Sequence, residues 1–235
     1  KHYGAKLKAV PGTLKEAITD AIKTWITNPD YYYVCGSAVS SFPFPKIVQF
    51  AQSIIGKEIR EQCLEQEKKL PNMIIGCVGG GSNFIGSIHE FLDEPNIKKI
   101  GVEAAETAAL THGTPNIMQG MKSYMLASSD GSKSLGGSSL GAGIQYFGVG
   151  PQHSYLKDQG AVTYTSATDK EILNAYKVVA QTEGISSALE PMAAAAEVLK
   201  QAKGKPKDFI IVLSLCGRGE KDLDTIEEHM GKDFE

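Results

Sequence analysis

The stretch IIGCVGGGSNFIG, residues 74–86, decides the fold because it joins an apolar run to a helix-like segment through three consecutive glycines, Gly79 to Gly81. Glycine adopts positive φ at little steric cost, so several backbone N–H groups can converge on one point. These donors add to the partial positive charge at the start of the following helix and make an anion site. Ser82 and Asn83 add side-chain donors. We therefore predict a phosphate-binding loop, since a merely tight turn needs only one or two glycines.

The kind of phosphate group is narrowed by what this loop lacks. A Walker loop needs Gly-Lys-Ser or Gly-Lys-Thr after the glycines, and neither is present. The dinucleotide fingerprint G-x-G-x-x-G, begun at Gly79, needs a glycine where Phe84 stands. Glu103 nevertheless ends the next predicted strand, about two dozen residues on, where a ribose-binding acid would lie. A nucleotide-binding α/β protein therefore stays open as a weaker alternative.

The composition is that of an ordinary globular protein. The 235 residues are 42% hydrophobic and 22% charged, with a formal net charge of −3. This length is at the upper end for one domain, so two lobes are possible. No basic excess predicts a nucleic-acid partner, and no apolar run approaches the ~18 residues of a membrane-spanning helix. Four scattered cysteines without metal-binding spacing indicate reduced thiols in a cytoplasmic protein: Cys35, Cys63, Cys77 and Cys216.

Apolar periodicity and turn residues predict strands that alternate with helices along most of the chain. Thr13 and Glu16 have the spacing of a capping box, and Gly184 stands at a C-cap position. Residues 104–150 are instead rich in glycine, serine and threonine, which predicts a loop-dominated insert. Strands are expected at residues 5–10, 31–38, 72–78, 97–104 and 208–215, and helices at 11–26, 46–69, 84–92, 169–184 and 187–202, with a short helix after residue 222.

This alternation predicts βαβ units, and hence an α/β fold with a doubly wound, mostly parallel sheet and helices on both faces. Ligands of such sheets bind beyond the carboxyl ends of the strands. Three loops are expected at that edge, residues 36–41, 79–83 and 216–219. The functional site is therefore predicted where these loops meet.

Two further positions have both a functional and a structural interpretation. Cys216 follows the last apolar strand and could hydrogen-bond a ring nitrogen of a cofactor, but Gly217 and Gly219 suit a structural turn equally well. Glu190 lies in a predicted helix, where a solvated carboxylate is the commoner role. The following histidines have no evident partner in the sequence and are predicted to be non-catalytic: His89, His112, His153 and His229.

Taken together, four stretches resemble the β subunit of tryptophan synthase, a pyridoxal-phosphate enzyme of fold type II. They run in the order of that family and span nearly the whole chain: CVGGGSN (77–83), GVGPQHSYLKDQGAVTYTSATDKE (148–171), TEGISSALE (182–190) and LSLCGRGEKD (213–222). The resemblance implies pyridoxal 5'-phosphate as the cofactor. It also implies a β-replacement reaction in which L-serine and indole give L-tryptophan and water.

The resemblance assigns roles residue by residue. Cys216 would face the pyridine nitrogen, where the family usually has serine, and Glu190 would assist the attack of indole. Gln145 stands where the family usually has an aspartate that contacts the serine-derived hydroxyl, which puts substrate choice in question. The implied cofactor-binding residues are Ser37, Gly79, Gly80, Gly81, Ser82, Asn83, Gly143 and Cys216, and the backbone carbonyls of Gly79, Tyr146 and Gly148 would bind sodium or potassium.

The resemblance also implies partners and one backbone feature. An α subunit would deliver indole, and the β chains would form a homodimer in the cytoplasm. The Phe42–Pro43 peptide bond, or its neighbour, is expected to be cis. The sequence EPMAA after residue 189 departs from the family's usual ESSHA, so a polar wall of the pocket is expected to be changed.

The largest departure from the family concerns the lysine that binds the cofactor as a Schiff base. In the family this lysine directly follows a histidine. Lys46, Lys122 and Lys221 do not match that motif, so the lysine is expected in a separate amino-terminal segment. Residues 1–45 would then be a remnant of the amino-terminal lobe and mobile subdomain, and residues 46–235 the carboxyl-terminal cofactor-phosphate-binding domain. We expect a fragment that is inactive alone. The alternative is a non-catalytic, phosphate-ligand-binding or regulatory remnant.

Overall fold

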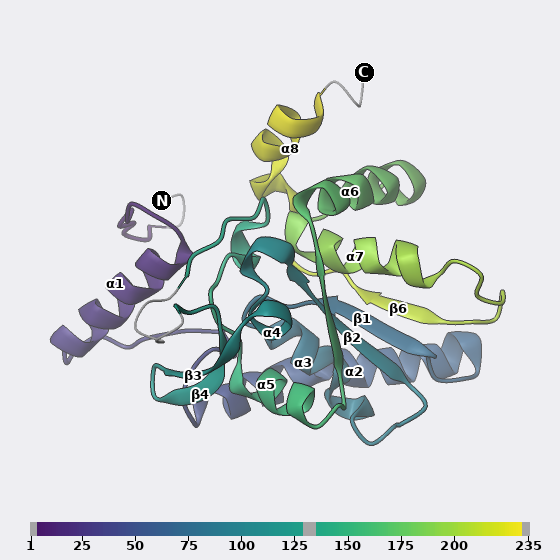
Figure 1. Cartoon of the computed structure of the whole chain (residues 1–235), viewed down its shortest axis with the longest axis horizontal. Coiled ribbons are helices and arrows are strands. Elements are labelled where there is room, and N and C mark those ends of the chain that lie inside the picture. The colour runs from purple at the N-terminus through teal and green to yellow at the C-terminus, as the bar shows by residue number, and fades with distance from the viewer. Residues whose placement is uncertain (1–3, 129–134, 232–235) are drawn as a thin grey trace.

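A four-stranded parallel sheet forms the centre of the computed structural model, which describes residues 4–128 and 135–231 (Figure 1). The strand order is β5-β2-β1-β6, and each neighbouring pair is parallel. The predicted α/β class and the parallel sheet are therefore confirmed. The strands are β1 Met73–Cys77, β2 Lys98–Ala104, β5 Thr163–Ala167 and β6 Ile211–Ser214.

Helices cover both faces of this sheet because its central strands are apolar on both sides. In β1, Ile75 packs toward one face, in a core shared with α6 and α7. Ile74 packs toward the other face, with α3 and α5. The long helix α2 lies against α3 on that second face (Figure 1). These helices are α2 Phe44–Glu67, α3 Ser82–Ile88, α5 Pro151–Asp158, α6 Asp169–Glu183 and α7 Leu189–Gln201.

The strand order reverses beside β1. The chain proceeds from β1 to β2 and on to β5 in one direction, and then returns through α6 and α7 to place β6 on the opposite side of β1. In a doubly wound sheet such a reversal opens a crevice beyond the carboxyl ends of the two strands. The loops that begin at residue 78, after β1, and at residue 215, after β6, flank that crevice.

Residues 104–150 contain more regular structure than predicted. An antiparallel hairpin pairs β3 with β4 and turns at Gln119 and Gly120, whose φ values are 46° and 74°. Two consecutive positive φ values are typical of the tight turn that matches strand twist. The elements here are β3 Thr114–Met118, β4 Met121–Met125, α4 Ala109–His112 and the short 3-10 helices Ala105–Thr107 and Ala142–Ile144.

Two predicted strands are wrong. Residues 5–10 and 31–38 form neither helix nor strand, and most of their side chains are exposed. A strand needs a neighbour for its backbone N–H and C=O groups, and the described part of the chain pairs none with these segments. The expected start of a helix at residue 46 is also late, because α2 begins at Phe44 with Pro45 in its first turn.

Other local predictions are confirmed. The Phe42–Pro43 peptide is cis, the Thr13–Glu16 capping box opens helix α1, and Gly184 ends α6 with a φ of 67°. None of the residues of α1, Leu14–Thr27, is buried. The domain boundary expected at residue 45 stays a prediction. The last helix is α8 Leu223–Met230, after the 3-10 helix Gly219–Lys221. Within residues 4–128 and 135–231, no helix combines the length and apolar character needed to cross a membrane.

Two facing glycines let α2 and α3 approach closely and thereby fix the helix that follows the GGGSN loop. A Cβ at Gly56 would lie 2.8 Å from the carbonyl oxygen of Gly86. A Cβ at Gly86 would collide with the carbonyl oxygen of Gln52. Backbone atoms cannot rotate away as a flexible side chain can, so any side chain here forces the helices apart.

We predict that Gly86→Ala lowers the free energy of unfolding by about 1–3 kcal/mol, the usual cost of overpacking. Gly136→Ala is the matched control, because a Cβ there meets no atom of the described residues within 4 Å. Urea denaturation followed by circular dichroism measures both. Equal stability of the two variants would contradict the close contact between the helices.

Candidate functional site

The GGGSN loop turns its carbonyl groups into the protein and leaves the amide groups at the helix start available. The carbonyl of Gly80 accepts a hydrogen bond from the amide of Gly150 at 3.1 Å, and that of Gly81 accepts one from Ile85 at 3.0 Å. Gly81 has a φ of 90°, which an L side chain rarely adopts. The first amides of a helix have no partner within it, so those of Ser82 and Asn83 suit an anion.

Contacts across the loop explain why it needs three glycines. A Cβ at Gly79 would lie 2.7 Å from the carbonyl oxygen of Gly143, and one at Gly80 would lie 2.6 Å from Oγ of Ser37. A Cβ at Gly81 would overlap the His153 ring. The structure thus brings Ser37 and Gly143, both predicted from the family resemblance, against the loop.

His153 holds this loop through a buried hydrogen bond, although the sequence around it indicated no role. The side chain is fully buried and its Nε2 lies 2.7 Å from the carbonyl oxygen of Gly81, 72 residues away. Its Nδ1 lies 2.8 Å from the hydroxyl of Tyr164. Burial lowers the pKa of His153 to about 4, so the ring is neutral at pH 7. Nε2–H therefore donates to Gly81, and the hydroxyl of Tyr164 donates to Nδ1.

A cavity of about 240 Å³ opens between the loops that follow β1 and β6. Two polar atoms in its lining side chains, Oε2 of Glu190 and Oδ1 of Asn83, are buried with no hydrogen-bond partner among the described residues. Buried polar atoms without partners are rare in folded proteins and suggest a ligand that supplies them. The lining residues are Cys77, Gly79, Gly80, Gly81, Ser82, Asn83, Gly143, Ile144, Glu190, Cys216, Gly217 and Lys221.

Glu190 is held rigidly at the wall of this cavity, so it is not the solvated carboxylate that its sequence context favoured. Its Oε1 accepts hydrogen bonds from the amide of Gly143 at 2.7 Å and from Nζ of Lys221 at 2.9 Å. Lys221 also donates to both oxygens of Asp222, at 2.7 Å each. Burial acts to lower the pKa of Lys221, but these acidic partners raise it overall. Lys221 is thus a bound cation that orients the Glu190 carboxylate.

Cys216 also lines the cavity, and its sulfur atom has a neighbour that the sequence did not indicate. The sulfur atoms of Cys216 and Cys77 are 3.6 Å apart. Cys77 is buried, whereas Cys216 is partly exposed. The sequence did not indicate this pair because 139 residues separate the two cysteines.

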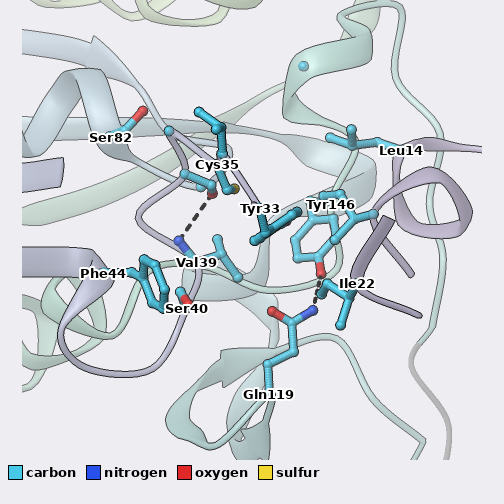
Figure 2. Close-up of a pocket in the computed structure, with 16 residues that line it drawn as sticks. Leu14, Ile22, Tyr33, Cys35, Val39, Ser40, Phe44, Ser82, Gln119 and Tyr146 are labelled. Atoms are coloured by element: carbon cyan, nitrogen blue, oxygen red, sulfur yellow. Dashed lines mark hydrogen bonds between the residues drawn. The ribbon is translucent and has the colours of Figure 1, made fainter. Parts of the chain in front are cut away.

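A second pocket, of about 440 Å³, adjoins the first and shares Gly80, Ser82 and Gly143 with it. Figure 2 shows Tyr33 and Tyr146 in this pocket, together with the hydrogen bond from Gln119 to the Tyr146 hydroxyl, which is 3.1 Å long. Ser37 also lines it, and its Oγ accepts a hydrogen bond of 3.1 Å from the amide of Val39. The remaining wall is largely apolar, with Leu14, Ile18, Ile22, Val34 and Phe44 among its residues.

Gln145 lies outside the lining of both pockets. Its side-chain amide donates to the carbonyl of Ser139 within the same loop. Tyr146 is buried, and Gly148 forms an isolated antiparallel bridge with Met125. The cation-binding role of the Gly79, Tyr146 and Gly148 carbonyls stays a prediction.

Glu103 serves the local fold rather than a ribose. The carboxylate accepts hydrogen bonds from the amide of Leu110 at 2.8 Å and from the amide and hydroxyl of Thr111 at 2.9 and 2.8 Å. Burial raises the pKa of Glu103 to about 7 against these bonds. Both of its oxygens already accept hydrogen bonds from Leu110 and Thr111, so this carboxylate does not serve as the ribose-binding acid that the dinucleotide interpretation requires.

Comparisons with known proteins identify the class of protein to which this fold and this cavity belong. The family described as pyridoxal-phosphate dependent enzyme matches residues 1–217, and the chain belongs to that family. The chain is 45% identical over 243 residues to the tryptophan synthase beta chain of Allorhizobium ampelinum, covering 98% of this chain and 60% of that one. It is 43% identical over 234 residues to that of Cereibacter sphaeroides, covering 95% and 57%. The chain therefore spans about 60% of the length of these curated relatives.

We predict that His153 makes stability depend on pH. The unfolded chain protonates this histidine near its usual pKa of about 6.5, whereas the folded chain does so only at about 4. Between these values the unfolded state binds more protons, so the free energy of unfolding falls by up to ~1.4 kcal/mol per unit as the pH decreases.

His153→Gln isolates this effect, because Glu103, whose raised pKa acts in the opposite sense, is present in both chains. Urea denaturation at several pH values from 7 to 4.5 should show the wild type losing more stability than the variant. Parallel pH profiles of the two chains would mean that the buried imidazole is not held neutral.

Proposed function

We propose that this chain forms the cofactor-phosphate side of a pyridoxal-phosphate site that converts L-serine and indole into L-tryptophan and water. The observation that carries the proposal is the 240 Å³ cavity at the strand-order reversal, with unpartnered oxygens of Glu190 and Asn83 in its wall. A compact ligand with several polar atoms fits such a wall. The beta chains of tryptophan synthase, at 43–45% identity, indicate the reaction.

In this proposal the glycine loop binds the cofactor phosphate. The amides of Gly79 to Asn83 supply the donors, and Ser37 approaches from the side of Gly80. Gly143 would lie against the ring and Cys216 would face the ring nitrogen, since both residues line the same cavity. A thiol is a weak hydrogen-bond partner and leaves that nitrogen unprotonated. The bound cofactor supplies an electron sink for negative charge at the substrate Cα.

Glu190 is the proposed catalytic carboxyl that assists indole attack. Its Oε1 is fixed by Gly143 and Lys221, which leaves Oε2 as the atom able to reach a substrate. A group with one oxygen anchored and one free is well placed to hold a proton at a defined point. A substrate-contacting role for Gln145 requires its amide to leave Ser139.

The adjoining apolar pocket suits indole. It meets the cofactor cavity at Gly80, Ser82 and Gly143, so a molecule there would lie beside the reacting group. Its aromatic and aliphatic wall stabilises a flat apolar molecule by removing apolar surface from water.

The finer proposals inferred from the relatives are an α subunit that supplies indole, a β homodimer, a sodium or potassium ion on the Gly79, Tyr146 and Gly148 carbonyls, and a cytoplasmic location.

The Schiff-base lysine is proposed to come from a segment outside these 235 residues. Lys221 lines the cavity, but its ion pairs with Glu190 and Asp222 raise its pKa and keep it protonated. A protonated amine cannot attack a carbonyl. The whole relatives are longer than this chain, which leaves room for such a segment.

The direct test combines this chain with a segment from the Allorhizobium relative that carries its lysine. We expect an absorbance band of bound pyridoxal phosphate and formation of tryptophan from serine and indole. Gly81→Ala should weaken cofactor binding about tenfold or more, because strain and contact with His153 distort the phosphate loop. Gly136→Ala is the control and should bind normally. Cofactor binding without turnover would favour the non-catalytic remnant, and neither band nor turnover would overturn the proposal.

Lys221 should remain unlabelled when this chain alone is mixed with pyridoxal phosphate and reduced with borohydride. Its protonation prevents bond formation with the aldehyde. Peptide mass spectrometry locates any pyridoxyl group, and the complemented protein should carry it on the supplied lysine. A label on Lys221 comparable with that positive control would show that this chain contains its own reactive amine.

A further inference from the structure

The cofactor cavity contains a pair of thiols whose arrangement implies chemistry beyond the proposed reaction. β1 and β6 are parallel neighbours, and their register sets Gly76 opposite Ser214. Cys77 is the next residue of its strand, and Cys216 lies two residues beyond Ser214. Both side chains point into the same cavity, with their sulfur atoms 3.6 Å apart.

We propose that Cys77 and Cys216 form a reversible disulfide that closes the ring-nitrogen position of the cofactor cavity. A disulfide requires a sulfur–sulfur distance of about 2.05 Å, so the two sulfur atoms need to approach by roughly 1.5 Å. Cys77 ends β1 and Cys216 lies just beyond the end of β6, so the parallel pairing of these strands holds the two sulfur atoms this close. We expect rotation of the two side chains to supply this approach.

The two sulfurs are chemically unequal, which gives each a role. The hydrogen bond from the Cys77 thiol lowers the pKa of Cys216, whereas the same bond and complete burial raise the pKa of Cys77. Cys216 is also the partly exposed member of the pair. It is therefore the attacking thiolate, and Cys77 is the resolving thiol.

Hydrogen peroxide is the proposed oxidant because it is small enough to enter the cavity. The thiolate of Cys216 attacks one peroxide oxygen, the O–O bond breaks, and the other oxygen leaves as water after taking a proton, which gives a sulfenic acid. The sulfur of Cys77 then attacks that of Cys216, the S–O bond breaks, and the departing hydroxide leaves as a second water with the Cys77 proton. Two thiols are oxidised to one disulfide, and one peroxide is reduced to two waters.

The expected consequence for the cofactor rests on the proposed function. In the disulfide, the Cys216 sulfur is drawn toward Cys77 and has no thiol proton, so the ring nitrogen loses its partner. The loss of one such hydrogen bond corresponds to about tenfold weaker binding. A thiol reductant should restore the affinity.

The test uses the full chain with Cys35→Ser and Cys63→Ser, so that only the pair can react. After treatment with hydrogen peroxide and alkylation, we expect the intact mass to fall by two hydrogens and a proteolytic peptide pair to be linked through Cys77 and Cys216. In a further Cys77→Ser variant, and in Cys77→Ala should the serine disturb the fold, Cys216 should instead be trapped as the dimedone adduct of its sulfenic acid. An unlinked pair with dimedone on Cys216 even when Cys77 is present would overturn the proposal.

Cofactor binding is measured separately, by titrating pyridoxal phosphate into the reduced, oxidised and re-reduced chain combined with the lysine-bearing segment. Weaker binding in the oxidised chain alone, restored by re-reduction, supports closure of the site. Equal affinity of the reduced and disulfide forms would overturn closure. Failure of the reduced chain to bind cofactor, with the disulfide nonetheless formed, would refute the proposed function and leave the thiol chemistry standing.

Discussion

The pairing of β1 with β6 is the constraint on which the site depends. These strands are distant in sequence, yet their parallel hydrogen bonds run from Met73 opposite Ile211 to Gly76 opposite Ser214. Because both strands end at the same edge of the sheet, the loop with the glycines and the loop with Cys216 meet there. The cavity, the thiol pair and the contact between Lys221 and Glu190 all follow from this adjacency. A change of register by one residue would turn Cys77 to the opposite face of the sheet and remove it from the lining of the cavity.

A second constraint is the absence of side chains where backbone segments meet. Gly79 and Gly80 are packed against Gly143 and Ser37, and Gly86 is packed against α2. These contacts bring segments from three parts of the chain within reach of one small ligand. They also hold the loop without charged side chains, because the carbonyl of Gly80 accepts from Gly150 and that of Gly81 accepts from Ile85 and His153. The position of the loop is therefore set by packing and by neutral hydrogen bonds, both of which act at short range.

The sequence predicted three of the four strands of the sheet, β1, β2 and β6, because these are short apolar runs, but it did not predict β5, whose sequence TYTSA is largely polar. The same reasoning failed for residues 31–38, whose aromatic residues favour a strand but find no partner among the described residues. The hairpin at Gln119 was missed because its strands lack clear alternation. Within the site, residues next to the glycine motif were predictable, whereas His153 and Cys77 act through contacts 72 and 139 residues away. Such contacts depend on topology, which local patterns do not specify.

The glycine loop and the Glu190 side of the cavity are held by different kinds of groups. His153 stays neutral beneath the loop, so it contributes hydrogen bonding and no positive charge. The nearby cation Lys221 is shared between Glu190 and Asp222, and Asp222 in turn accepts a hydrogen bond of 2.9 Å from the amide of Leu189 at the start of α7. A phosphate at the loop is therefore met by backbone dipoles rather than by a side-chain cation. Backbone dipoles do not titrate, so the pH dependence of phosphate binding would come from the phosphate itself, whose second pKa is about 6.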